Sequence, residues 1–402
     1  MTDIVEAPTT DELVECVRCL APIWRDRSIA VSDRRRLPDE TVDELRAAGL
    51  LRVLQARRNG GFELGLSTHL QIVSAIAEGC PSTAWVVGVA HAHSWLLGHF
   101  PPAAQDDVYR PDPDALVAAV IRARGRAERV DGGYRLTGRW PFGSGCEHAD
   151  WVVLGAEIVD ASGRAVDEGD LLLPAADVVL NDDWHVDGLR ATGSCSISVD
   201  GVFVPEHRFL SLGALAAGTT PGIGHHPNGW LHLASPTPVL AIALTGAAVG
   251  AARAGLEEFV RLVPSRTVAY VQPPPGDGAG MIQSDWSATH RLLGDAAIRI
   301  DEGELLLTRS AAAIDDHARR RAPMERELRA RVRMDCAQGV RRCLEAVESL
   351  YLATGGSGLQ SSNRIGQLLR DLQGINLHAL LSIETNREMY GRVLLGLEAP
   401  LV

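Results

Sequence analysis

The hydrophobic periodicity of the chain changes twice, and this constrains the fold more than any other feature. Residues 1–112 place apolar side chains at helical spacing, residues 113–212 alternate or run in short apolar bursts, and helical spacing returns in residues 213–402. We therefore expect an α+β protein with an N-terminal helical domain, a small antiparallel β domain and a C-terminal helical bundle. The order is not a βαβ alternation, which argues against a doubly wound nucleotide-binding fold.

Turn and capping residues refine this division. Pro38 and Pro81 are placed to open helices, the second of which runs to about residue 98. Between 113 and 212, the pairs Asp131-Gly132 and Asp200-Gly201 predict hairpin turns. In the last part we expect loops at 205–233 and at 264–283, which contains Pro273–Pro275, and helices at 236–263, 284–313, 324–354 and 375–396.

Composition excludes several classes of protein. The net charge of -12 argues against a nucleic-acid-binding surface. The sequence contains no lysine, which excludes Schiff-base, pyridoxal-phosphate and P-loop chemistry, since each needs an amine. Seven scattered cysteines and the absence of a charged-then-apolar leader favour a cytoplasmic protein without a metal site. The apolar run from Thr83 to Leu97 is too short to span a membrane.

Three loop segments carry the residues of greatest chemical interest. They are WPFGSGCEHADW at 140–151, NDDWHVDGLRATGS at 181–194, and TGGSGLQSSN at 354–363, the last followed by His378. Together with the helical–β–helical order, they resemble the acyl-CoA dehydrogenase superfamily over nearly the whole chain. Within it, the chain is most similar to two-component (group D) flavin monooxygenases. The resemblance implies a middle β-barrel domain and a C-terminal four-helix bundle that assembles a homotetramer.

The resemblance also implies a flavin site on the first two segments. Its isoalloxazine ring is expected against the turn of Trp140 and Phe142, with Ser144 near N5. Small residues let the backbone approach a planar ring, and a hydroxyl can hydrogen-bond to it. Trp184 is expected to pack beside the flavin and Ser194 beneath it.

The third segment is expected to serve the flavin phosphates of a neighbouring subunit. In related dehydrogenases, the loop that corresponds to Gly355 and Gly356 of this chain makes that contact. Arg266 falls near the position of an arginine that reaches the flavin phosphate, for which a guanidinium is well suited. The pair Arg370-Asp371 is interpreted as structural.

Two histidines are the remaining candidates for catalysis. His378, interpreted as lying on the last helix, corresponds to a histidine over the flavin that holds the C4a-hydroperoxide or deprotonates a phenol. His93 shares a helix face with Trp85 and corresponds to a residue on the substrate side of the flavin. His91 must point elsewhere, so these two do not form a chelating pair. A metal site among His225, His226 and His232 is not expected.

One departure decides between two branches of the superfamily. Dehydrogenases need a glutamate to abstract the substrate α-proton, and the stretch after the Gly-Gly loop has no acid before Asp371. This favours a monooxygenase that takes FADH2 or FMNH2 from a separate NAD(P)H:flavin reductase. It would use O2 to hydroxylate an aromatic or polycyclic small molecule, for which phenolic and indolic compounds are the candidates, through a C4a-hydroperoxyflavin. N-oxygenation of an amine, a dehydrogenase-like oxidoreductase and a non-catalytic homologue stay open as alternatives.

Overall fold

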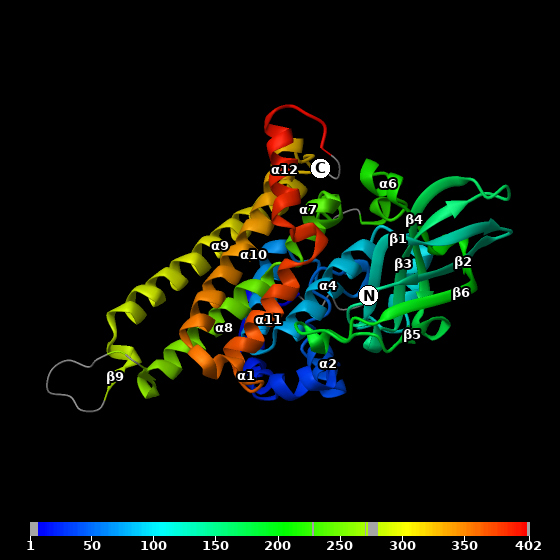
Figure 1. The fold of residues 1–402 in the computed structure, drawn as a ribbon. Helices are drawn as coiled ribbons and strands as arrows, with labels where there is room; N and C mark the ends of the chain where they lie inside the picture. The colour runs from blue at the N-terminus through cyan, green and yellow to red at the C-terminus, as the bar shows by residue number, and fades with distance from the viewer. Residues whose placement is uncertain (1–6, 227–228, 270, 272–279, 400–402) are drawn as a thin grey trace.

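The computed structural model describes residues 7–226, 229–269, 271 and 280–399. Helices fill the N-terminal part, a curled sheet forms one end of the molecule, and long helices form the other end (Figure 1). The helix after Pro81 begins and ends where the sequence predicts. The N-terminal helices are α1 (Thr10–Arg34), α2 (Asp39–Ala47), α3 (Leu66–Gly79), α4 (Pro81–Leu97) and α5 (Pro102–Tyr109).

Seven strands form the β domain, in the order β5-β6-β2-β1-β3-β4-β7. All neighbouring pairs are antiparallel except β1 and β3, which are parallel. The expectation of a purely antiparallel domain is thus wrong at one pair. The turn 141–150 returns the chain to the start of β1, so the next strand runs beside β1 in the same direction. The strands are β1 (Val117–Val130), β2 (Gly133–Trp140), β3 (Trp151–Val159), β4 (Ala165–Pro174), β5 (Val179–Asn181), β6 (Ser196–Pro205) and β7 (Phe209–Ser211).

Only one of the two predicted hairpin turns is a hairpin. Gly132, with φ +73°, joins β1 to β2 as expected. Gly201, with φ +63°, instead lies inside β6, where the pairing register with β2 shifts. A glycine in the left-handed region also serves a β-bulge, so an Asp-Gly pair alone does not separate the two outcomes.

The C-terminal helices differ from the prediction in two places. The expected helix at 236–263 is divided into α7, which ends at Ile242, and α8, which begins at Gly246. The expected helix at 375–396 begins only at Ile383, as α12, and the unpredicted helix α11 ends at Asn376, so His378 lies in the break between them. The predicted loop 205–233 also contains β7 and the short helix α6, while Pro273–Pro275 lie outside the described residues. The remaining elements are α6 (Leu212–Ala217), α7 (Pro236–Ile242), α8 (Gly246–Leu262), β8 (Thr267–Val268), β9 (Met281–Ile282), α9 (Ser287–Arg319), α10 (Arg326–Ala353), α11 (Arg364–Asn376) and α12 (Ile383–Leu394).

The helices that precede the β domain in the sequence and those that follow it share one hydrophobic core. Residues such as Trp24, Ile72, Leu307 and Val347 belong to the same buried cluster, while the sheet encloses a second cluster around Trp140. The division at 112/113 and 212/213 therefore stays a prediction. The segment Pro236–Ser265 is long and apolar enough to cross a membrane, but 83% of its apolar window is buried in the bundle, as in a core helix.

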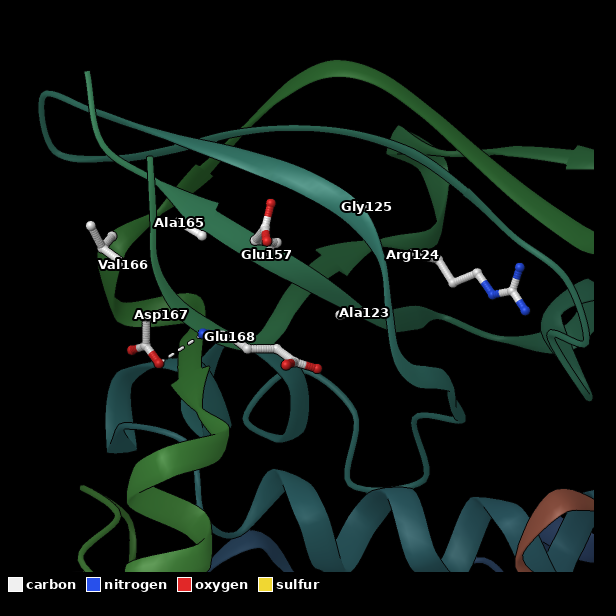
Figure 2. Close-up of a pocket in the computed structure, with 8 residues that line it drawn as sticks. All are labelled: Ala123, Arg124, Gly125, Glu157, Ala165, Val166, Asp167 and Glu168. Carbon is white, nitrogen blue, oxygen red and sulfur yellow. Dashed lines mark hydrogen bonds between the residues drawn. The ribbon is translucent and has the colours of Figure 1, made fainter. Parts of the chain in front are cut away.

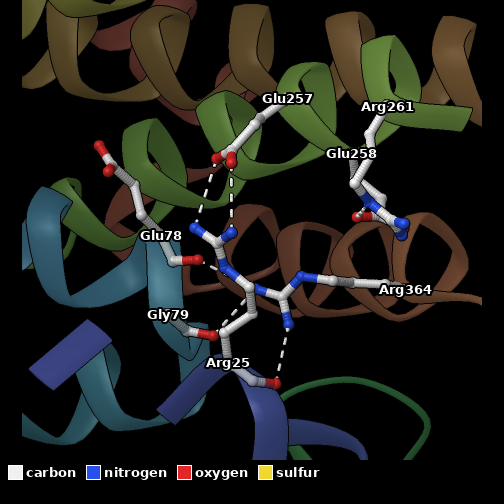
Figure 3. A network of polar contacts seen from close by, with 7 residues as sticks. All are labelled: Arg25, Glu78, Gly79, Glu257, Glu258, Arg261 and Arg364. Atoms are coloured by element: carbon white, nitrogen blue, oxygen red, sulfur yellow. Dashed lines mark hydrogen bonds and ion pairs between the residues drawn. The ribbon is translucent and has the colours of Figure 1, made fainter. Parts of the chain in front are cut away.

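Arg364 fixes the position of α11. Its guanidinium donates to the backbone carbonyls of Arg25, Glu78 and Gly79 (Figure 3). It also donates to the hydroxyl of Ser28. Because α1, α3 and α11 meet at this one side chain, the segment that follows α11 is held against the N-terminal helices.

Candidate flavin site

A chain of hydrogen-bonded hydroxyls joins the first two predicted site segments. The Ser144 Oγ lies 2.8 Å from the Ser194 Oγ, which lies 2.6 Å from the Thr192 Oγ1. The indole N–H of Trp85 on α4 donates to the Ser144 Oγ at 3.1 Å. The structure therefore brings together two predicted residues, Ser144 and Ser194, and adds Thr192 and Trp85.

The direction of each hydrogen bond in this chain can be deduced. A carbonyl oxygen only accepts, so the Thr192 hydroxyl donates to the Leu189 carbonyl at 2.8 Å. The Ser194 hydroxyl must then donate to Thr192, and the Ser144 hydroxyl to Ser194. The Ser144 oxygen accepts from Trp85 and keeps one lone pair. The turn thus presents a hydrogen-bond acceptor at Ser144.

His378 lies beside the same tryptophan. Its ring centroid is 5.8 Å from that of Trp85, and its Nδ1 accepts the backbone N–H of Leu380 at 3.3 Å. Burial lowers the pKa of His378 to about 4, so its imidazole is neutral near pH 7. Because Nδ1 is an acceptor, the proton of the neutral ring is on Nε2, which is therefore a donor.

His93 has the opposite tautomer. Its Nδ1 donates to the Val117 carbonyl at the start of β1, at 2.8 Å, which leaves Nε2 as an acceptor. Burial lowers the pKa of His93 to about 4, although the hydrogen bond to Val117 opposes the shift. His93 lies eight residues after Trp85 on α4, about 12 Å along the helix. His91 contacts His69 instead, so it points away from His93, as predicted.

The turns that carry the hydroxyls have unusual backbone conformations. Phe142 and Leu189 adopt φ of +68° and +53°, a region that non-glycine residues seldom occupy. Asp371 holds the second turn, since its Oδ1 accepts the backbone N–H of Leu189 at 2.6 Å. Burial raises the pKa of Asp371 to about 6, and the bond to Leu189 opposes the shift. Strain of this kind persists where surrounding contacts enforce it, which is common at functional sites.

The aromatic residues of the first two segments have different environments. Phe142 is 66% exposed and meets the ring of Trp184 edge to face at 6.0 Å, so both offer surface to a planar ligand. Trp140 is fully buried in the core of the sheet, where its Nε1 donates to the Gly155 carbonyl at 2.7 Å. The Trp140 side chain therefore supports the turn from inside and does not face the site.

Arg266 and the Gly-Gly loop form a separate cluster. The Arg266 guanidinium donates to the Ser357 hydroxyl at 2.9 Å and to the Thr354 carbonyl. Gly355 has φ +57°, and nothing lies within 4 Å of the position of a Cβ at Gly355 or Gly356, so this backbone is open to a ligand. The 13 residues of α11, about 20 Å of helix, separate the cluster from His378. Within one chain, these cofactor candidates do not meet Ser144.

A groove at the outer rim of the sheet contains none of the predicted residues. It measures about 490 Å³ and is lined by Ala123, Arg124, Gly125, Glu157, Ala165, Val166, Asp167 and Glu168 (Figure 2). No cluster of three His, Cys, Asp or Glu side chains suited to a metal occurs within the described ranges.

Thr192 and Leu189 were missed by sequence reasoning. No pattern indicates that their loop meets the turn at Ser144, because that meeting depends on the pairing of β2 with β6. Trp85 carried a signal, since it shares a helix face with His93. Trp95, two residues from His93, instead packs against His99 in another part of the core.

Comparison with known proteins agrees with this geometry. Residues 242–383 match the family model "Acyl-CoA dehydrogenase, C-terminal domain". The pigment production hydroxylase of Rhodococcus sp. (strain ATCC 21145) is 34% identical over 97% of each chain. The oxygenase component of an FADH(2)-dependent resorcinol hydroxylase from Rhizobium sp. (strain MTP-10005) is 31% identical over 99% of each chain.

Solved structures show the same architecture. XiaF from Streptomyces sp., in complex with FADH2 and glycerol, superposes with a TM-score of 0.89 at 32% identity, over 98% of this chain and 97% of XiaF. The 3-HSA hydroxylase from Rhodococcus sp. RHA1 gives a TM-score of 0.90 at 29% identity, over 97% and 98% of the two chains. The fold is thus that of the acyl-CoA dehydrogenases.

The chain belongs to the oxygenase components of two-component flavin-dependent monooxygenases. This confirms the prediction of an oxidoreductase that uses reduced flavin, and it places the chain with the hydroxylases rather than the dehydrogenases. An oxygenase component works with a separate flavin reductase, as predicted from the resemblance.

Proposed function

We propose that the chain hydroxylates a phenolic aromatic molecule at a site formed by Ser144, His378 and His93. When bound, reduced flavin supplies the activation of O2 for this chemistry. The observation that carries the proposal is the hydrogen-bond chain that leaves an acceptor on Ser144, which contacts Trp85, the same residue that packs near the ring of His378.

The acceptor on Ser144 fits reduced flavin better than oxidised flavin. Position N5 of the reduced ring bears a hydrogen, whereas N5 of the oxidised ring is itself an acceptor. Phe142 and Trp184 offer apolar surface for the ring system beside this turn. These residues therefore fit the cofactor, and they favour its reduced form.

The two histidines have different hydrogen-bonding roles. The Nε2–H of His378 donates to an oxygen atom, whereas the Nε2 of His93 accepts a hydrogen bond from the hydroxyl of a phenol. This hydrogen bond draws the proton away from the phenol oxygen, which raises the electron density of the ring and promotes attack by the ring carbon on electrophilic oxygen. Of the two roles predicted for His378, the tautomer supports holding oxygen, and we assign the contact with the phenol hydroxyl to His93.

The Arg266 cluster supports a tetramer in which each flavin contacts two chains. Leu352 and Leu359, on either side of the Gly-Gly loop, are 71% and 80% exposed, and Leu305 on α9 is 69% exposed. Packing against a neighbouring copy would remove the apolar surface of these three side chains from water. A neighbouring copy would bring its own Gly355 and Gly356 to the flavin phosphates. We also propose that this assembly works in the cytoplasm.

The test is turnover with a flavin reductase, NADH and a panel of phenols, followed by mass spectrometry of the products. We expect incorporation of one oxygen atom into a phenol, with little product from the methyl ethers of the same phenols. Equal turnover of the ethers would contradict the role of His93. Oxidation of an amine in place of a phenol would contradict the proposed substrate class.

A further inference from the structure

A second cavity lies at the opposite end of α4 from Trp85. It measures about 350 Å³, within the range of small-molecule sites. The His226 Nε2 donates to the carbonyl of Gly98, the C-cap residue of α4, at 2.8 Å. Thirteen residues of helix, about 20 Å, separate Gly98 from Trp85, so this cavity is distinct from the flavin site. Its lining consists of Arg57, Arg58, Glu63, His225, His226, Gly229 and Trp230.

Glu63 is the most unusual residue of this cavity. It is only 7% exposed and has φ +50°, a conformation that non-glycine residues seldom adopt. Its Oε2 accepts the backbone N–H of Arg57 at 3.1 Å, whereas its Oε1 has no hydrogen-bond partner among the described residues. The Oε1 faces Gly229, where a Cβ would lie 2.5 Å from it. A buried carboxyl oxygen without a donor costs about 1–3 kcal/mol, so a ligand that donates here would be favoured.

Cationic groups flank this carboxyl. Arg58 is engaged, since its guanidinium donates to Gln105 at 2.9 Å and to Asp106 at 3.0 Å. The guanidinium of Arg57 is exposed and forms no ion pair within the part of the chain that the structure describes. Arg57 is therefore available to bind an anion through paired hydrogen bonds.

Trp230 supplies an aromatic surface. The guanidinium of Arg319 lies 4.2 Å from the centre of its ring, which fixes the orientation of the indole. The cavity thus combines an unpaired guanidinium, a buried acceptor and an aromatic ring.

We propose that this cavity is a second small-molecule site, which binds an aromatic carboxylate that also carries a hydroxyl group. The carboxylate pairs with Arg57, the hydroxyl donates to the Glu63 Oε1, and the aromatic ring packs at Trp230. An inorganic anion can pair only with Arg57, and a simple phenol can donate only to Glu63. The cavity should therefore bind a ligand that carries both groups more tightly than a ligand that carries one of them.

Isothermal titration calorimetry of the flavin-free protein tests this proposal with four probes: 4-hydroxybenzoate, benzoate, phenol and inorganic phosphate. We expect 4-hydroxybenzoate to bind at least about 10-fold more tightly than the other three. Arg57→Gln should weaken its binding about 10-fold. Glu63→Gln, which presents an amide in place of the acceptor pair, should reduce the preference over benzoate.

Arg291→Gln is the matched control, since Arg291 is an exposed arginine near the start of α9, far along that helix from Arg319. Binding that is unchanged in Arg57→Gln would place the ligand in the flavin pocket and overturn the proposal, as would phosphate binding equal to that of 4-hydroxybenzoate. Absence of heat with any probe at millimolar concentration would also overturn it. If Glu63→Gln does not fold, the exposed Arg57 variant decides alone.

Discussion

The turn at Ser144 and the loop at Gly355 were both predicted to bind flavin, but they differ in how much one chain supplies. At Ser144, three elements of the same chain converge: α4 provides Trp85, the loop before β6 provides Ser194, and the segment after α11 provides His378. The Gly355 loop is held by Arg266 and Gln283 and is flanked by exposed leucines. The first region is complete within one chain, whereas the second is completed by a neighbouring copy in the assembly that we propose.

The largest expected effect is on His378 in the first region. Replacing His378 with Ala removes the Nε2–H donor, so hydroxylation should fall on the order of 10²-fold while flavin affinity changes little. His378→Gln keeps a donor and should recover part of the rate. Product formation per NADH consumed is the measurement, with His290→Ala, an exposed histidine, as the control. Equal loss of flavin affinity would mean that His378 only shapes the pocket.

Arg266→Gln tests the second region. Loss of the charged contacts should weaken flavin binding by about 10- to 100-fold, because the loop and the phosphate contact depend on the same guanidinium. Arg261→Gln, on an exposed turn of α8, is the control. Fluorescence titration of flavin measures the affinity, and an unchanged value would exclude Arg266 from the cofactor site.

Ser144→Ala tests whether the turn at Ser144 distinguishes reduced flavin from oxidised flavin. Removing the acceptor should weaken the binding of reduced flavin about 5-fold and leave the binding of oxidised flavin nearly unchanged. Anaerobic and aerobic titrations of the same preparation give the two values, with Ser265→Ala as the exposed-serine control. A parallel loss for both redox states would contradict the proposed hydrogen bond to N5.

Leu359→Asp tests whether flavin binding at the Gly355 loop requires a neighbouring copy of the chain. A charge in an apolar contact between chains should reduce the assembly state, and flavin affinity should fall with it. Light scattering and flavin titration at the same protein concentration measure both. Val166→Asp, on the exposed rim of the sheet, is the matched control. A wild-type monomer that binds flavin fully would refute the two-chain site.

The smallest expected effect concerns the stability of the first region. The pKa of Asp371 rises from 3.8 to about 6 on folding, so the folded state binds more protons between these values, and stability falls as pH rises from about 4 to 6. Asp371→Asn keeps an acceptor for the Leu189 N–H without ionising. It should flatten this dependence and stabilise the protein by about 1 kcal/mol at pH 7. Urea unfolding at pH 4.5 and 7 measures the difference, and an undiminished slope would contradict the account.

The contrast also explains what the sequence could predict. Pro38 and Pro81 located the starts of α2 and α4, and Asp131-Gly132 marked a true hairpin. Periodicity missed the break between α11 and α12, because Leu377 and His378 continue an apolar-rich pattern although the backbone turns there. The parallel pairing of β1 with β3 depends on where the turn 141–150 leads, which local residue choice does not encode.

The same limit applies to the candidate site. Ser144, His93 and His378 were predicted from the resemblance to a known family. No pattern within their own segments marks them as catalytic residues. The hydrogen-bond chain through Thr192 to Leu189 was not predicted, since it requires two loops about 50 residues apart to meet. The buried location of Trp140 was missed for a related reason: a tryptophan at the end of a strand points to either face of a sheet.

The most direct test of the central claim is the affinity of the purified protein for flavin in both redox states, measured by anaerobic titration with FADH2 and aerobic titration with FAD. The acceptor on Ser144 predicts that reduced flavin binds at least about 5-fold more tightly and that the protein is purified without tightly bound oxidised flavin. Tighter binding of oxidised FAD, with bleaching by an acyl thioester in the absence of a reductase, would contradict the account and indicate a dehydrogenase.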